Sequence, residues 1–174
     1  NLGSLNIDHV YDVEDFVAGA ETISAKGYGK FIGGKGLNQS IALARAGAEV
    51  FHAGAIGEDG EYLKNYLAKA NVNVDFINTI TAPTGHAIIQ VNSLGQNCII
   101  VYGGANTMIE KEDIDAMINT FSKGDMLLLQ NETSNLSYAI IKAKNHGMKV
   151  ALNPSPANKA ILGCPLDMVD YFLL

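Results

Sequence analysis

The chain has 174 residues, of which 48% are hydrophobic and 17% are charged, so it can bury the core of a domain. Its formal net charge of −6 argues against a surface built for nucleic acids or anionic membranes, because such a surface needs a basic patch. No apolar run has the length of a membrane span and the opening residues lack a signal-peptide pattern, so we expect a cytoplasmic protein.

The two cysteines, Cys98 and Cys164, lie in apolar surroundings without C-x-x-C spacing. This pattern predicts buried free thiols in a reducing compartment, and neither a disulfide nor a metal site. Both ends of the chain look interrupted, because position 1 is not Met and the apolar run 168–174 has nothing after it. We therefore expect a part of a longer domain.

The first predicted elements are strands. Residues 5–13 form an extended segment in which Asn6 and Asp8 point to the same side, because side chains alternate along a strand. An amide and a carboxylate on one side suit ligand hydroxyls, but a turn with Asx hydrogen bonds explains the same two residues. Residues 16–32 are rich in glycine, alanine and β-forming residues, and predict two short strands joined by a loop.

The stretch 33–39, Gly-Gly-Lys-Gly-Leu-Asn-Gln, runs directly into a helical pattern that ends at Gly47. Glycines let the backbone approach a ligand, and a helix start offers unpaired N–H groups. Lys35, Asn38 and Gln39 can all hydrogen-bond to oxygen atoms. The stretch predicts a pocket for an oxygen-rich small ligand, although a glycine-rich turn without any ligand explains it equally well.

Two known phosphate-binding motifs do not fit this stretch. Gly29 and Gly34-Lys35 have the spacing of a P-loop, but Gly36 stands where that motif needs a Ser or Thr hydroxyl for magnesium. The dinucleotide fingerprint fails because Ile32 occupies its third glycine position.

After the glycine stretch, strands and helices mostly alternate. The predicted strands cover residues 49–55, 72–80, 84–92, 97–102, 125–130 and 149–152, followed by a last strand at the carboxyl end. The predicted helices cover residues 36–47 and 62–70, a segment after a capping box of Thr107 and Glu110, and residues 134–147. The alternation predicts a parallel sheet with helices on both faces, while residues 9–32 and 72–101 look like a separate small sheet.

Four polar residues follow the ends of predicted strands: Asn6, Asp8, Glu132 and Asn153. In parallel α/β folds, ligands bind at the carboxyl ends of the strands. Lys35 and Asn38 begin a helix beside the same edge. Polar groups converging on one edge are a stronger indication of a binding site than any single motif.

Five segments, in the same order, resemble one known family: residues 3–8, 33–39, 54–60, 103–106 and 152–154. The chain resembles the ribokinase-like carbohydrate kinases over nearly its whole length. Within that family, Lys35 with Asn38-Gln39 favours the sugar kinases over the nucleoside kinases.

The resemblance implies a three-layer α/β/α domain with a small β lid that covers the sugar and often forms a homodimer contact. Residues 1–174 would be the amino-terminal part of that single domain, with lid strands at about 9–32 and 72–101. The implied activity is transfer of the ATP γ-phosphoryl group to the primary hydroxyl of a sugar, D-ribose being favoured. The implied cofactors are ATP and Mg²⁺, and a monovalent cation is left open.

Carried over by position, seven residues would bind the sugar: Asn6, Asp8, Gly34, Lys35, Gly36, Asn38 and Glu132. The family's catalytic Asp, and most of its nucleotide and magnesium contacts, lie further downstream than residue 174. The resemblance therefore implies that this chain holds no catalytic residue and no cofactor-binding residue, and that it is inactive alone. A sheet cut at this point would also expose an apolar edge.

Two other functions are open at this stage. One is a non-catalytic sugar-binding module, which would regulate a partner through a dimer formed by the lid. The other is a kinase of the same family that acts on fructose, another carbohydrate, a sugar phosphate or a nucleoside. A sugar phosphate would need additional basic residues at the pocket, and the only arginine, Arg45, is expected inside a helix.

Overall fold

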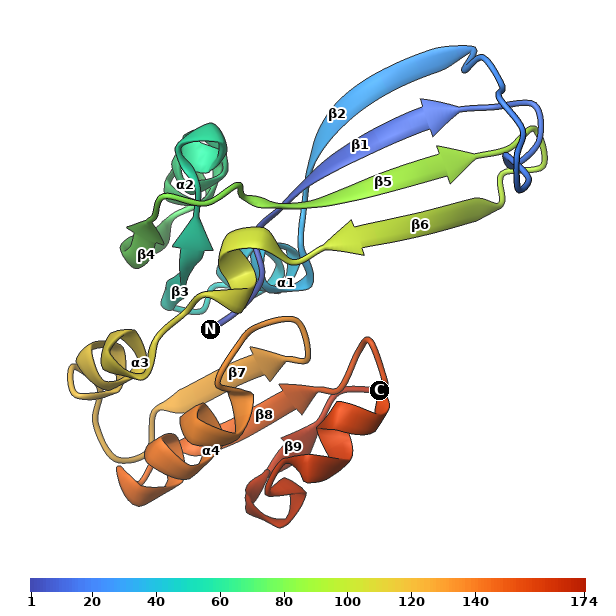
Figure 1. The fold of residues 1–174 in the computed structure, drawn as a ribbon. Coiled ribbons are helices and arrows are strands. Elements are labelled where there is room, and N and C mark those ends of the chain that lie inside the picture. The colour runs from blue at the N-terminus through green and yellow to red at the C-terminus, as the bar shows by residue number, and fades with distance from the viewer.

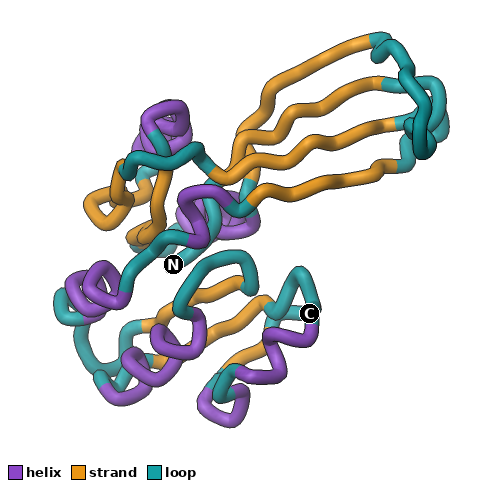
Figure 2. Tube along the Cα trace, viewed as in Figure 1, coloured by secondary structure: helices purple, strands orange, loops and turns teal.

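The computed structural model describes residues 1–174 and consists of a parallel sheet flanked by helices, from which a second sheet projects (Figures 1 and 2). The strands are β1 (Asn6–Asp12), β2 (Gly27–Gly33), β3 (Val50–Ile56), β4 (Val72–Thr79), β5 (Gly85–Val91), β6 (Asn97–Tyr102), β7 (Met126–Gln130), β8 (Lys149–Asn153) and β9 (Tyr171–Phe172). The α-helices are α1 (Lys35–Arg45), α2 (Glu61–Lys69), α3 (Lys111–Ile118) and α4 (Leu136–Asn145). Short 3₁₀ helices are η1 (Glu58–Gly60), η2 (Gly104–Thr107), η3 (Lys159–Gly163) and η4 (Leu166–Met168). None of the helices combines the length and apolarity that crossing a bilayer requires.

The main sheet is parallel throughout and has the order β4-β3-Leu2-β7-β8-β9. Leu2 occupies the middle position, because it bridges both Ala53 in β3 and Leu129 in β7. The continuous apolar run of β7 predicted a strand covered on both faces. Residues 127–129 are buried, but Met126, the first residue of the run, is 55% exposed at a cleft on one face.

Helices cover the two faces of the main sheet. On one face, α1 and α2 bury Leu37 and Leu63 against residues of β3 and β4. On the other face, α3 and α4 bury Ile114 and Ile140 against β7 and β8, around Leu129. This arrangement confirms the predicted mixed α/β class with a mostly parallel sheet.

The second sheet has the order β2-β1-β5-β6, and it extends away from the helices (Figure 1). It is mostly antiparallel, but β1 and β5 pair in parallel. Two features differ from the expected small sheet. Asn6 and Asp8 lie inside β1 rather than past a strand end, because the chain stays extended where it leaves the main sheet at Leu2. Residues 72–79 belong to the main sheet, because the crossover through α2 brings β4 beside β3.

Several local predictions were wrong. Only one strand, β2, forms within residues 16–32, and it follows a loop over residues 13–26. The capping box before α3 pairs Glu110 with Asp113, rather than Thr107 with Glu110. The last long helix starts at Leu136 instead of residue 134, because Asn135 adopts a left-handed conformation with φ 57°.

Two apolar regions lack a covering layer. An apolar cleft of about 610 Å³ lies beside β7, β8 and β9, on the face that α3 and α4 leave open, and Met126 and Phe172 line it. The second region is on the projecting sheet.

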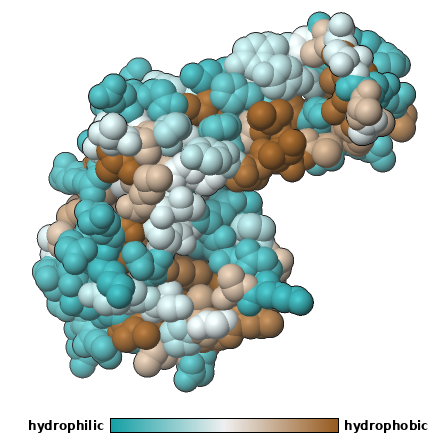
Figure 3. Space-filling model, viewed as in Figure 1, coloured by the Kyte–Doolittle hydropathy of each residue, from teal (hydrophilic) through white to brown (hydrophobic).

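Both cysteines have free thiols. Cys98 is exposed in β6 of the projecting sheet, while Cys164, which follows η3, is half-buried. The prediction that both cysteines are buried is therefore wrong, because no layer packs on the sheet that carries Cys98. Figure 3 shows apolar side chains gathered along the edge of this sheet.

Candidate functional site

The candidate site lies at the junction where the chain passes from the main sheet into the projecting sheet. Gly3 and Ser4 form this junction, and the start of α1 lies directly against their backbone. A Cβ atom on Gly36 would stand 2.5 Å from the Gly3 Cα, and one on Gly34 would stand 2.6 Å from the Ser4 carbonyl oxygen. Gly34 also has φ 101°, which favours glycine. The glycines therefore allow the helix start to approach the backbone of the junction, whereas the sequence predicted an approach to a ligand.

Glu132 reaches this junction from the loop that follows β7. Its carboxylate accepts a hydrogen bond from the Lys35 Nζ at 2.8 Å and a longer one from the Lys35 backbone N–H at 3.3 Å. The same carboxylate accepts from the Ser4 hydroxyl, whose oxygen accepts the Gly36 N–H at 3.3 Å. The Glu132 side chain is 12% exposed and that of Lys35 is 41% exposed, so the pair is anchored on the carboxylate side and open to solvent on the ammonium side.

Asp8 lies on the same side of the junction, over the backbone of Gly33. A Cβ atom on Gly33 would overlap the Asp8 carboxylate, so a larger residue at this position would force the Asp8 side chain to move. Burial raises the pKa of Asp8, and the negative charge of Glu132 raises it further, while His9 and Lys35 lower it. Asp8, Lys35 and Glu132 therefore form one electrostatic group, although no direct hydrogen bond joins Asp8 to the other two.

Asn6 is 6% exposed and is held by a second asparagine. The Asn106 Nδ2 donates to the Asn6 Oδ1 at 2.8 Å, and Asn106 is itself 1% exposed. Asn106 also pairs with both backbone groups of Leu5, and its carbonyl accepts from the Ser134 N–H at 3.1 Å. Asn106 in η2 thus connects two parts of the site: its side chain bonds to the start of β1, and its backbone carbonyl bonds to the loop that carries Glu132.

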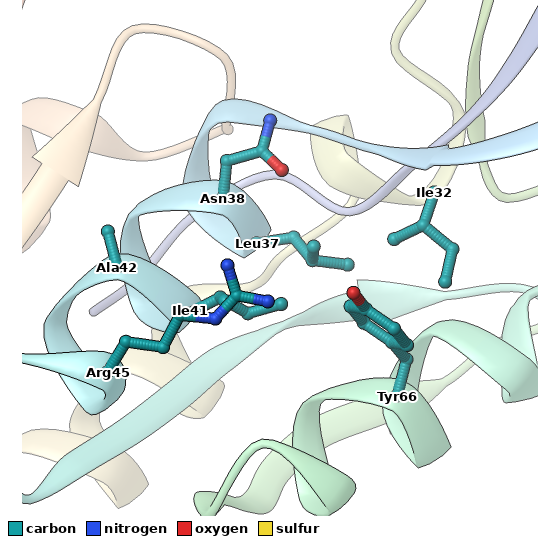
Figure 4. Close-up of a pocket in the computed structure, with 7 residues that line it drawn as sticks. All are labelled: Ile32, Leu37, Asn38, Ile41, Ala42, Arg45 and Tyr66. Atoms are coloured by element: carbon teal, nitrogen blue, oxygen red, sulfur yellow. The ribbon is translucent and has the colours of Figure 1, made fainter.

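Asn38 does not join this cluster through any side-chain hydrogen bond. It is exposed in the first turn of α1, at the rim of a neighbouring cavity of about 210 Å³. Figure 4 shows Arg45 of α1 and Tyr66 of α2 beside Leu37 and Ile41, and all four residues line this cavity. Asn153, also expected at the binding edge, uses its side chain locally and accepts from the Ser155 N–H at 3.0 Å.

A buried network of hydrogen bonds joins α1 to β3, to β7 and to Asn1. The Ser40 hydroxyl lies 2.8 Å from the His52 Nδ1, and the Asn1 Nδ2 donates to the Ser40 Oγ at 2.7 Å. The Gln130 Nε2 donates to the Gln39 Oε1 at 2.6 Å. Burial lowers the pKa of His52 to about 3, so this histidine is neutral and structural. These bonds fix the helix that carries Lys35.

Reasoning from the sequence missed two residues of the cluster, Ser4 and Asn106. Both lie in segments that carry the family resemblance, residues 3–8 and 103–106, but neither had a predicted role. The assembled site offers an ammonium group (Lys35), an amide (Asn6) and two carboxylates (Asp8 and Glu132) at the junction of the two sheets. Such a mixture of donors and acceptors suits a ligand rich in hydroxyl groups. No three His, Cys, Asp or Glu side chains group together in a way that could hold a metal ion.

Comparison with known sequences decides the family. A family described as pfkB family carbohydrate kinase matches residues 1–172. The chain belongs to this family. Ribokinase from Haemophilus influenzae is 39% identical over 161 residues, an alignment that covers 90% of this chain and 53% of that protein. The chain thus spans about half the length of the curated relatives it matches.

Solved structures of the family share the fold. Ribokinase from Thermotoga maritima superposes with a TM-score of 0.84 at 34% identity, and covers 98% of this chain and 57% of its own. The Arabidopsis thaliana ribokinase, solved with ribose and ATP, gives a TM-score of 0.75 at 31% identity, over 88% of this chain and 52% of its own. Carbohydrate kinases of this family are phosphotransferases, and the expected ribokinase-like fold is confirmed.

Proposed function

We propose that this chain carries the sugar-binding part of a kinase that transfers the ATP γ-phosphoryl group to the primary hydroxyl of D-ribose. The observation that supports it is the cluster of Asp8, Lys35 and Glu132 at the junction of the two sheets. The ribokinase relatives, among them the structure described with ribose and ATP, favour ribose within the carbohydrate kinase family.

In this proposal each side chain of the site has a defined role in binding the sugar. Asp8 accepts hydrogen bonds from sugar hydroxyls, and Asn6 supplies an amide beside it. Lys35 donates to a sugar oxygen, while Glu132 holds the ammonium group in place and shares its remaining acceptor capacity with the sugar. The Gly34 and Gly36 backbone forms the floor, and Asn38 contributes after a rotation of its exposed side chain. Orienting the acceptor hydroxyl is a large part of phosphoryl transfer.

ATP and Mg²⁺ would supply the phosphoryl group and neutralise its charge. We assign no residue of this chain to either, and a monovalent cation is likewise unassigned. The base that deprotonates the sugar hydroxyl would lie in the part of the longer relatives that has no counterpart here. Residues 1–174 alone are therefore expected to bind sugar without phosphorylating it, and phosphorylation of ribose by the pure chain would contradict this.

The Asp8→Asn variant tests the sugar site. We expect it to weaken D-ribose binding roughly tenfold to a hundredfold, because a charge-assisted hydrogen bond becomes a neutral one. Isothermal titration calorimetry on the full-length protein measures the effect, with D-fructose and adenosine as competing ligands. The matched control is Asp12→Asn, which changes an exposed carboxylate on the same side of β1 and is expected to leave binding unchanged.

Three outcomes of this titration would change the proposal. A preference for fructose or adenosine would keep the family and replace the substrate. Ribose binding that survives Asp8→Asn would remove Asp8 from the site. Full-length protein that binds ribose without phosphorylating it in the presence of ATP and Mg²⁺ would favour a non-catalytic, regulatory module.

We further propose that the projecting sheet is a lid through which the protein forms a homodimer. Its edge strand β6 exposes Ile99, Ile100 and Val101 at 48%, 63% and 56%, which is an unusual concentration of apolar side chains on a free edge. We infer that a second copy of this chain covers the β6 edge, because most soluble oligomers are symmetric homo-oligomers.

Introducing a charged residue on β6 tests whether the protein forms the proposed dimer. We expect Val101→Lys to convert the dimer into a monomer in sedimentation velocity experiments, because a buried ammonium group in an apolar contact is costly. The control is Asn97→Lys at the start of the same strand. A wild-type protein that sediments as a monomer would reject the dimer.

A further inference from the structure

The amide of Asn106 has only one possible orientation. Its Oδ1 accepts from the Leu5 N–H at 3.0 Å and its Nδ2 donates to the Leu5 carbonyl at 3.2 Å. A backbone N–H can only donate and a backbone carbonyl can only accept, so exchanging the two ends of the amide would break both bonds. The Nδ2 of Asn106 therefore faces Asn6.

This orientation determines the orientation of Asn6. The atom of Asn6 that faces the Asn106 Nδ2, at 2.8 Å, must be the acceptor Oδ1. The Asn6 Nδ2 is then directed away from Asn106, and no group of the chain accepts a hydrogen bond from it. The two backbone groups of Leu5 thus fix, through Asn106, which end of the Asn6 amide remains available.

Close packing also restricts the two amides. Both press on Gly85 at the start of β5, where a Cβ atom would overlap the Asn106 Nδ2 and stand 2.5 Å from the Asn6 Oδ1. Asn106 is 1% exposed, so water cannot replace Asn6 as its partner. The pair is a rigid unit between β1, β5 and η2.

We propose that Asn106 is a positioning residue that makes Asn6 a hydrogen-bond donor in the site. The ligand atom that meets Asn6 is then an acceptor, such as a sugar hydroxyl or ring oxygen, while the neighbouring Asp8 accepts from a hydroxyl. The inference rests on the proposed sugar site for its functional meaning, but the orientation of the two amides can be tested without a sugar.

Proton exchange of the side-chain amides tests the orientation directly, in the unaltered full-length protein. We expect the Asn106 side-chain protons to be protected in NMR spectra, since both are bonded and buried, and the Asn6 protons to exchange faster. Asn6→Asp and Asn106→Asp variants assign the signals. Protected Asn6 protons with rapidly exchanging Asn106 protons would overturn the inference, whether or not ribose binds.

A double-mutant cycle tests the positioning role. We expect Asn106→Ala to weaken ribose binding roughly tenfold in the wild-type background and to have almost no effect in the Asn6→Ala background. A purely structural role would weaken binding equally in both. If Asn106→Ala does not fold, Gly85→Ala disturbs the same pair sterically and takes its place in the cycle.

The control for the cycle is Asn92→Ala. Asn92 is another asparagine that is 8% exposed and bonded to neighbouring backbone, but it lies at the far end of the lid. Its loss is expected to leave ribose affinity unchanged. Wild-type protein that binds no ribose would reject the proposed function, while the exchange pattern would still decide the orientation of Asn6.

Discussion

Replacing Gly34 by alanine is expected to destabilise the protein by about 3 kcal/mol or more and to abolish sugar binding. Two costs add at this position. The backbone has φ 101°, which an L-residue adopts only with strain, and the new Cβ would stand 2.6 Å from the Ser4 carbonyl oxygen and 2.9 Å from the Asn6 nitrogen. Both neighbours are backbone atoms, so relief requires moving the junction or α1. Urea unfolding measures the stability and calorimetry measures the binding.

The opposite end of α1 provides the matched control. Gly47 has φ 88°, but a Cβ atom there would meet nothing within 4 Å. Gly47→Ala should therefore cost only the conformational strain, about 1 kcal/mol, and leave binding intact. Gly36→Ala isolates the cost of the steric contact. Its Cβ atom would stand 2.5 Å from the Gly3 backbone, but Gly36 does not have a positive φ. Equal losses for Gly34→Ala and Gly47→Ala would mean that the close approach of α1 to the junction is not important.

Changing Lys35 or Glu132 should shift the pH dependence of sugar binding in opposite directions. The pKa of Asp8 is raised by burial and by Glu132, and is lowered by His9 and Lys35. If the ionised Asp8 carboxylate binds the sugar, affinity is lost as the pH falls through its pKa. Lys35→Met removes a lowering influence, so binding should fail at a higher pH than in the wild type. Glu132→Gln removes a raising influence, so binding should persist to a lower pH.

Titration calorimetry from pH 4 to pH 8 measures these midpoints on the acidic limb, with the two variants compared at equal ionic strength. Lys30→Met serves as the control, because Lys30 lies on β2 and is not among the charges that shift the pKa of Asp8, which are Glu132, His9 and Lys35. A His9→Gln variant separates the contribution of the neighbouring histidine. Midpoints that move in the same direction for Lys35→Met and Glu132→Gln would show that Asp8 is not the group being titrated.

The sequence was informative where one local pattern determines the structure. The apolar run of β7 predicted a buried strand, and residues 127–129 are buried. The glycines before α1 indicated that the backbone there makes a close approach, although the sequence did not show that its partner is the backbone of Gly3 and Ser4. Alternation also placed Asn6 and Asp8 on one side of a strand. Each of these inferences needed only neighbouring residues.

Predictions failed where distant segments decide the structure. Residues 72–79 look like any half-buried strand, and only the crossover through α2 assigns them to the main sheet. Asn106 lies 100 residues from Asn6, and nothing in its own glycine-rich segment indicates that partner. Likewise, Glu110 rather than Thr107 caps α3, because Thr107 is the last residue of η2.

The position of Leu2 in the middle of the main sheet has a kinetic consequence. The first residues of the chain cannot complete their pairing until β7 is available, and the bond between Ser4 and Glu132 joins residues 128 apart. Closing so long a loop is entropically costly and slows folding, so the proposed sugar site should be among the last features to form. Recovery of the proposed ribose binding during refolding would then lag behind recovery of helical circular dichroism.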